Sequence, residues 1–163
     1  MKQNESMSKK ELAQLATVRT LLTAQTTLVL ATTGEDGVPR STALFYFHDD
    51  DLRLYWFSSR TVLHSLNCAH QPQASISISP HAETWKQIKG VQMQGTVSIV
   101  PSGARRKAIT TAYVERFSLG KAFALALRSA SLYCFEPTWL RYVDNSRHFG
   151  YKFEIDLARE AQG

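Results

Sequence analysis

The sequence has little of what defines several common protein classes. Its 163 residues include only two cysteines, Cys68 and Cys134, which are too few for a disulfide framework and too far apart for a metal knuckle. We expect both to be reduced, partly buried thiols. No apolar run approaches the length needed to cross a bilayer, and the first residues, MKQNESMSKKE, are polar and unlike a signal peptide. We therefore expect a cytoplasmic protein with no membrane partner.

Several motifs of catalysis and ligand binding are also missing. The chain has no Gly-x-Gly-x-x-Gly and no phosphate-loop sequence, which disfavours a dinucleotide-binding fold. It has no Gly-x-Ser-x-Gly either, which argues against an esterase. The five histidines are scattered, and Cys68-x-His70 lacks a matching second pair, so we expect no metal site. Asp49, Asp50 and Asp51 are better explained as a solvated turn.

The composition is otherwise that of an ordinary globular protein, with more basic than acidic residues. The length of 163 residues predicts one domain, and the hydrophobic fraction of 44% and charged fraction of 20% are typical of a globular protein. We expect this domain to span residues 1–163 and residues 1–8 to form a disordered tail. The net charge of +5 favours anionic partners, either nucleic acid or a phosphorylated small molecule. Part of this charge is the run Arg105-Arg106-Lys107, which we expect on a solvated helix face.

Short strands joined by turns dominate the pattern. Ser8 and Glu11 form a capping box that opens an amphipathic helix over residues 9–24. Asp36-Gly37 is typical of a hairpin turn, and Gly95 marks a bulge or a close approach of two backbones. The other expected elements are strands at 26–33, 38–48, 52–57, 73–80, 91–100, 130–143 and 151–157, a helix at 61–70, and a helical region over 101–128 that is broken near 118–120.

This order of elements predicts a mainly β fold with peripheral helices, of the α+β class. Antiparallel strands at such short spacing usually close into a barrel, because closure removes exposed edges. We expect a single antiparallel barrel.

The segment LYWFSSRT at residues 54–61 carries the clearest chemical signal. A strand ends there and a helix begins, so free N–H groups and the positive end of the helix dipole meet hydroxyl groups and Arg60. This combination favours a dianion such as a terminal phosphate. The alternative is that Ser58 or Ser59 only caps the helix.

Arg40 adds to this signal. We expect it on the neighbouring strand of a 38–57 hairpin, opposite residues near Ser58 to Arg60, so that two arginines and several hydroxyls converge. An isolated surface arginine is the alternative interpretation.

The chain resembles a known family at this point. The stretch that begins at Leu28, LVLATTGEDGVPRSTALFYFHDDDLRLYWFSSRTVLHSLNCAHQPQASISI, is similar to the FMN-binding split barrels related to pyridoxamine 5′-phosphate oxidase. The later GVQMQGTVSIV fits the next strand of that family, and WLRYVDNSRHFGYK resembles the carboxyl-terminal motif of a subgroup of small uncharacterised bacterial proteins. The resemblance covers roughly residues 10–145. It implies an antiparallel split β-barrel that binds FMN at the interface of a homodimer.

The resemblance also implies positions for the cofactor. Arg40 would lie near the FMN phosphate, followed on the same strand by Ser41, with Thr42, Ala43 and Leu44 along the isoalloxazine. Ser58 occupies the place of a phosphate-binding threonine or serine, next to Ser59 and Arg60. The other subunit would contribute further contacts, for which the candidates are Trp85, Gln92 and Trp139.

Two positions depart from the family pattern. His64 stands where many relatives carry a phosphate-binding lysine, and Leu63 stands where they often have an arginine. Arg60, or His64 in its protonated form, would have to supply the missing charge.

Three functions of different classes follow. The first is an FMN-dependent oxidoreductase acting on an unidentified small molecule, for which no catalytic side chain is named because the flavin carries the chemistry. The second is a non-catalytic carrier or sensor that holds flavin or haem. The third, a nucleic-acid binder, ranks last because no aromatic and basic sheet signature accompanies the charge. The polar and aromatic residues of 139–148 border the flavin in one interpretation and are core or dimer-interface aromatics in the other.

Overall fold

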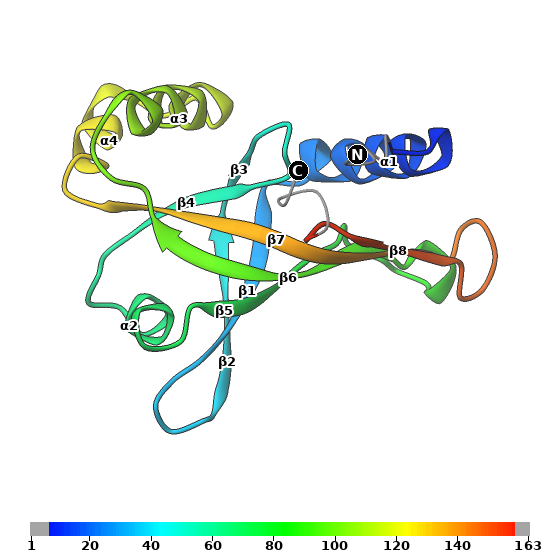
Figure 1. The fold of residues 1–163 in the computed structure, drawn as a ribbon. Coiled ribbons are helices and arrows are strands. Elements are labelled where there is room, and N and C mark those ends of the chain that lie inside the picture. Colours follow the sequence, from blue (N-terminus) through cyan, green and yellow to red (C-terminus); the bar gives the residue numbers. More distant parts are fainter. Residues whose placement is uncertain (1–6, 159–163) are drawn as a thin grey trace, which may run out of the picture.

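The computed structural model describes residues 7–158. A long amino-terminal helix is followed by strands that alternate with shorter helices (Figure 1). In chain order the elements are α1 (Lys9–Ala24), β1 (Thr27–Thr33), β2 (Pro39–Phe45), β3 (Phe47–His48), β4 (Leu54–Ser58), α2 (Leu63–His70), β5 (Gln73–Ile78), η1 (Trp85–Gln87), β6 (Lys89–Ile99), α3 (Ala104–Arg116), α4 (Lys121–Ala126), β7 (Ser131–Asp144) and β8 (Lys152–Asp156).

The strands form one antiparallel sheet that curls into a half-barrel. Its order is β2-β1-β5-β6-β7-β4-β3, and β8 pairs with β7 beyond the end of β4. The central strands β6 and β7 are long and wrap across the molecule in Figure 1. The fold is therefore the expected mainly β split barrel with peripheral helices.

The sequence patterns predicted most local features correctly. The capping box of Ser8 and Glu11 is present at the start of α1. Asp36-Gly37 makes the β1–β2 turn, where Gly37 has a φ of +71°. The register shifts between Gln94 and Gly95, and a Cβ added to Gly95 would lie 2.1 Å from the carbonyl oxygen of Glu136. Only glycine permits this close approach of β6 and β7.

The predicted hairpin over residues 38–57 is wrong. β2 pairs with β1, so that Arg40 lies opposite Thr32, while β3 pairs with β4 at the other end of the sheet path. The chain crosses between these two strands at Tyr46, which is fully buried and donates a hydrogen bond to the carbonyl oxygen of Leu22 in α1. Burying this aromatic ring between strands separates β2 from β3, and alternation alone does not reveal such a crossing.

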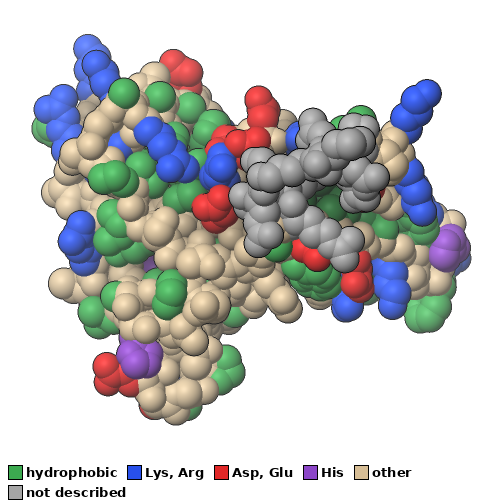
Figure 2. All heavy atoms as spheres, viewed as in Figure 1, with side chains coloured by type: hydrophobic (Ala, Val, Ile, Leu, Met, Phe, Trp, Pro, Cys, Tyr) green, Lys and Arg blue, Asp and Glu red, His purple; other side chains and the backbone are tan. Residues whose placement is uncertain are grey.

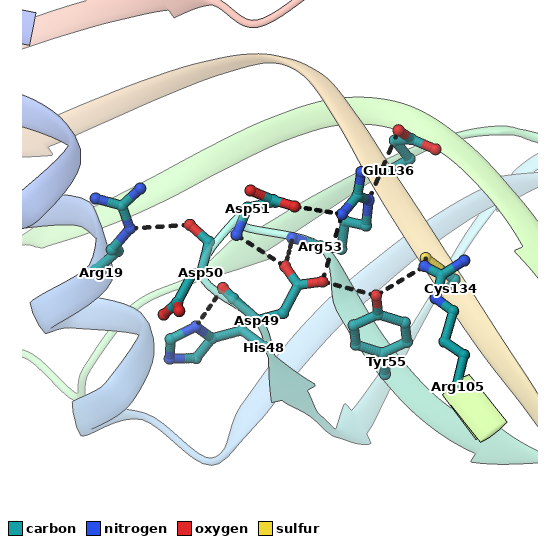
Figure 3. Close-up of polar contacts among 10 residues, drawn as sticks. All are labelled: Arg19, His48, Asp49, Asp50, Asp51, Arg53, Tyr55, Arg105, Cys134 and Glu136. Carbon is teal, nitrogen blue, oxygen red and sulfur yellow. Dashed lines mark hydrogen bonds and ion pairs between the residues drawn. The ribbon is translucent and has the colours of Figure 1, made fainter. Parts of the chain in front are cut away.

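A polar network attaches α3 to the barrel (Figure 3). The Tyr55 hydroxyl donates to the Asp49 carboxylate at 2.7 Å and accepts from Arg105 at 2.9 Å. Arg106 donates to the carbonyl oxygen of Ala130 at 2.7 Å. Arg105 and Lys107 are exposed, as expected of a solvated helix face, whereas Arg106 is partly buried. Both arginines also find an acceptor on the sheet or its connection.

Among residues 7–158, no helix is long and apolar enough to span a membrane. The same residues contain no group of three metal-ligating side chains close enough to hold an ion. Both cysteines are free and buried. The tail expected over residues 1–8 lies outside the described residues except for Met7, which packs against the core, and Ser8, which caps α1.

Candidate functional site

Helix α2 is fixed to the β1–β2 hairpin by one buried hydrogen bond. The Asn67 side-chain amide donates to the Thr32 hydroxyl at 3.1 Å, and both side chains are buried. A Cβ added to Gly34 would lie 2.7 Å from Oδ1 of Asn67, so the helix sits close against the turn. This contact places α2 on the same side of the sheet as the inward face of β2, because Thr32 lies opposite Arg40.

Arg40 lies on this inward face, directly opposite Thr32. Its guanidinium makes two hydrogen bonds with the Asp36 carboxylate, at 2.7 and 3.0 Å. That hydrogen-bonded partner holds the pKa of Asp36 at about 2, well below its ordinary value. Arg40 is thus a cation that a single exposed carboxylate holds in place.

Ser58 and His64 meet at the amino-terminal end of α2. The Ser58 hydroxyl and Nε2 of His64 lie 2.8 Å apart. Burial lowers the pKa of His64, so its ring is neutral at neutral pH. His64 also lies one turn before Asn67 on the same face of α2.

The loop between β4 and α2 supplies further donors. The hydroxyls of Ser59 and Thr61 lie 2.9 Å apart, and the residue that caps α2, Val62, makes no side-chain capping bond. The interpretation of Ser58 or Ser59 as a helix cap is therefore wrong. The first N–H groups of α2 are left without a side-chain acceptor, which is the arrangement that suits an anion.

Arg60 does not meet Arg40 across a hairpin, contrary to the prediction from the sequence. Its Nε donates to the hydroxyl of Ser131 at the start of β7, at 2.9 Å. The predicted pairing of Arg40 with the 58–60 segment across one hairpin is wrong, since the two belong to strands at different places in the sheet.

A second part of the candidate site is the outward face of the sheet, which we call the open sheet face. Opposed residues form two rows across five strands, as the strand registers show. One row is Ala43, Val29, Ser77, Gln92 and Arg141; the other is Ser41, Ala31, Ser75, Gln94 and Trp139. Arg141 is the only charged residue in these rows, and it pairs with Glu154 of β8 at 2.8 Å.

The open sheet face is hollowed, and its rows carry no charge apart from Arg141. A depression of about 370 Å³ lies over β1, β5, β6 and β7, with Trp139 and Arg141 at its rim. The Arg141 guanidinium lies over the Trp139 ring, 5.3 Å from its centroid. Small side chains such as Ala31 and Ser75 leave room for a flat molecule or for another protein surface here.

Trp85 lies apart from both regions. It belongs to η1 and packs edge-on against Phe149 of the β7–β8 loop, with ring centroids 5.6 Å apart. Both rings are largely exposed, at 52% and 79%. Figure 2 shows Lys and Arg side chains around the β8 end of the molecule and again over α3 and α4.

The predicted site residues thus fall into separate groups within one chain. His64 belongs to α2 and Ser58 contacts it, while Arg40 lies opposite Thr32, which α2 contacts through Asn67. The open sheet face holds Ser41, Ala43, Gln92 and Trp139. Thr42 and Leu44 lie on the inward face of β2, where Leu44 packs against the core. Sequence reasoning missed Asp36, Asn67 and Gln94; the period of two from Gln92 was the signal available for Gln94.

Comparison with known proteins gives a family and a fold. A family model described as pyridoxamine 5′-phosphate oxidase matches residues 14–144. A UPF0306 protein of Yersinia pseudotuberculosis is 24% identical over 112 residues, which cover 69% of this chain and 72% of that protein.

Solved structures agree on the fold. A haem-binding protein from Mycobacterium smegmatis superposes with a TM-score of 0.74 at 20% identity, covering 91% of this chain and 60% of that one. A Clostridium acetobutylicum protein related to general stress protein 26, of the pyridoxinephosphate oxidase family, gives 0.64 at 14% identity and covers 90% and 96%.

Proposed function

Because the chain belongs to the pyridoxamine 5′-phosphate oxidase family, we propose that its homodimer binds FMN and acts as an oxidoreductase on a small organic molecule. The observation that carries this proposal is the donor set at the start of α2. An uncapped helix end, the Ser58 hydroxyl and the cation Arg40 all lie on the side of the sheet that α2 covers.

The residues present fit the phosphate of FMN. A terminal phosphate carries close to two negative charges at neutral pH and has three strong acceptor oxygens. Ser58, Ser59, Thr61 and the first N–H groups of α2 offer donors, and Arg40 offers charge once it leaves Asp36. Neutral His64 is the weak point of this set, since it donates a hydrogen bond but supplies no charge until it is protonated.

The open sheet face supports the dimer. Its rows of Ala, Val, Ser and Gln side chains carry no charge across β2, β1, β5 and β6, and half-exposed Val29 lies among them. An uncharged, hollowed face of this kind suits a second copy of the chain, with the isoalloxazine held between the two subunits. When bound, the flavin supplies the hydride and electron transfer. Gln92 and Trp139, which lie on this face, are the side chains that we assign to the partner's flavin.

The test is the ligand that the purified protein retains. FMN predicts a yellow preparation that absorbs near about 450 nm, as flavins do, and mass spectrometry of the released ligand identifies it. Turnover with a reduced nicotinamide then separates an enzyme from a carrier. Colourless protein that refuses added FMN at micromolar concentration would overturn the proposal.

A haem carrier is the second candidate. Its support is the resemblance to the haem-binding protein of Mycobacterium smegmatis, together with a half-buried histidine, His64, that burial keeps neutral. Iron binds the neutral form of imidazole. A Soret band in place of flavin absorbance, lost in His64→Ala, would select this candidate.

A further inference from the structure

A separate cavity of about 330 Å³ lies on the other side of α2, against the end of β6. β5 pairs with β6 only as far as Thr96, and the N–H of Val97 then donates to the carbonyl oxygen of Pro72, so Ser98 and Ile99 have a strand neighbour on the β7 side alone. Helix α2 covers the vacant edge with small side chains, which leave space. The lining consists of Arg60, Ser65, Cys68, Ala69, Val97, Ser98, Ile99 and Tyr133. We call this space the α2 cavity.

One buried hydroxyl in the α2 cavity has no partner. Ser65 is only 4% exposed, and its hydroxyl makes no hydrogen bond with any described residue. Helical hydroxyls elsewhere in the chain donate to the carbonyl four residues before them, as Thr20 and Thr110 do at 3.0 and 2.7 Å. Ser65 stands in the first turn of α2, where no helical carbonyl precedes it. A buried unpaired hydroxyl is destabilising, and a ligand atom that bonded to it would remove that cost.

The polar groups around the α2 cavity are donors. Nε of Arg60 donates a hydrogen bond to the Ser131 hydroxyl, and the remaining guanidinium N–H groups have no partner among the described residues. The Ser98 and Tyr133 hydroxyls add further donors, and the Tyr133 ring is fixed by stacking on Trp56. No acidic side chain lines the space. Burial raises the pKa of the Cys68 thiol to about 11, so that group is uncharged as well.

The walls of the α2 cavity are apolar. Val97, Ile99 and Ala69 form them together with the Cys68 side chain. An occupant therefore needs a compact apolar body and one acceptor group with negative charge. We propose that the α2 cavity binds a small carboxylate with a flat apolar body, of which benzoate is the simplest example, with the carboxylate between Arg60 and Ser65.

The test is a methyl NMR titration of the full chain with sodium benzoate. We expect saturable shifts of the Val97 and Ile99 methyl signals. Arg60→Gln keeps much of the side chain but removes its charge, and it should weaken benzoate binding by about tenfold or more, as expected for a charge-assisted hydrogen bond. Ser65→Ala should weaken it several-fold, and Ser65→Val, which also fills the space, should abolish it.

Matched controls separate this site from general effects. Arg128→Gln and Ser79→Ala change exposed residues away from the cavity and should leave the benzoate affinity unchanged. Benzyl alcohol, which has the same ring without charge, should bind weakly and equally to wild type and Arg60→Gln. The proposal fails if the Val97 and Ile99 signals do not shift with saturation, or if Arg60→Gln binds benzoate as wild type does. It also fails if Ser65→Val keeps full benzoate affinity, because benzoate would then bind somewhere other than the filled cavity.

Discussion

The Asn67 amide donates to the Thr32 hydroxyl at 3.1 Å, and this buried bond sets the position of α2 against the β1–β2 hairpin. Thr32 faces Arg40 across the hairpin, and His64 lies one turn before Asn67. The bond therefore links the strand and the helix that carry the candidate phosphate donors. Moving α2 would separate Arg40 from the Ser58 end of the site.

We expect Gly34→Ala to lower the free energy of unfolding by about 1–3 kcal/mol, the range for overpacking. The added Cβ would lie 2.7 Å from Oδ1 of Asn67. Urea denaturation measures the change. In an Asn67→Ala background the clash is absent, so the same substitution should then cost much less. Equal costs in the two backgrounds would contradict the close packing.

Arg40→Ala and Ser58→Ala should each weaken FMN binding, Arg40→Ala by about tenfold or more because a charge-assisted contact is lost. Fluorescence quenching of added FMN gives the Kd. Arg128→Ala, an exposed arginine beside α4, is the matched control. Unchanged affinity in both variants would remove Arg40 and Ser58 from the site.

Asp36→Asn should have the opposite effect. The carboxylate holds the Arg40 guanidinium through two hydrogen bonds, and its low pKa of about 2 reports how strongly it prefers to stay charged beside that group. Removing the charge frees Arg40, so the same FMN titration should give a lower Kd. A higher Kd would mean that Asp36 positions Arg40 for FMN instead of competing for it.

FMN affinity should depend on the protonation of His64. Burial lowers the pKa of His64, so the unfolded chain takes up the proton more readily, and stability falls as the pH drops through about 6.5, the unfolded value. A bound phosphate favours the charged ring, so affinity should rise as the pH falls from neutral toward the lowered pKa of His64 in the unliganded protein. His64→Gln should remove this pH dependence. His64→Lys should also bind FMN without this pH dependence, and more tightly. A flat wild-type profile would place His64 away from the phosphate.

Tyr55→Phe should destabilise the protein by about 1–3 kcal/mol, because Asp49 and Arg105 lose the buried hydroxyl between them (Figure 3). Tyr113→Phe is the matched control: Tyr113 is also buried, but its hydroxyl makes no hydrogen bond with a described residue. Chemical denaturation of both variants gives the comparison. Equal costs would show that the network adds no stability beyond ring packing.

Val29→Glu should convert the proposed dimer into a monomer. Val29 is 44% exposed on the open sheet face, whose rows carry no charge on β2, β1, β5 and β6, and burying two carboxylates there on dimerisation would be costly. Light scattering after size-exclusion chromatography measures the mass. Leu125→Glu, which changes a more exposed leucine of α4, should leave the mass unchanged. A dimeric Val29→Glu would assign the interface to another face.

The sequence by itself determined the local elements and the family. Capping residues, period-two alternation and the glycines of the turn and bulge act over a few residues, so they predicted α1, β5, the Asp36-Gly37 turn and the Gly95 bulge. Which strands pair is decided over long sequence separations, and there the burial of Tyr46 separated β2 from β3. The tertiary structure also decided the partners of the charged groups. Arg60 donates to Ser131 and Arg105 to Tyr55, because only the folded sheet brings those acceptors within reach.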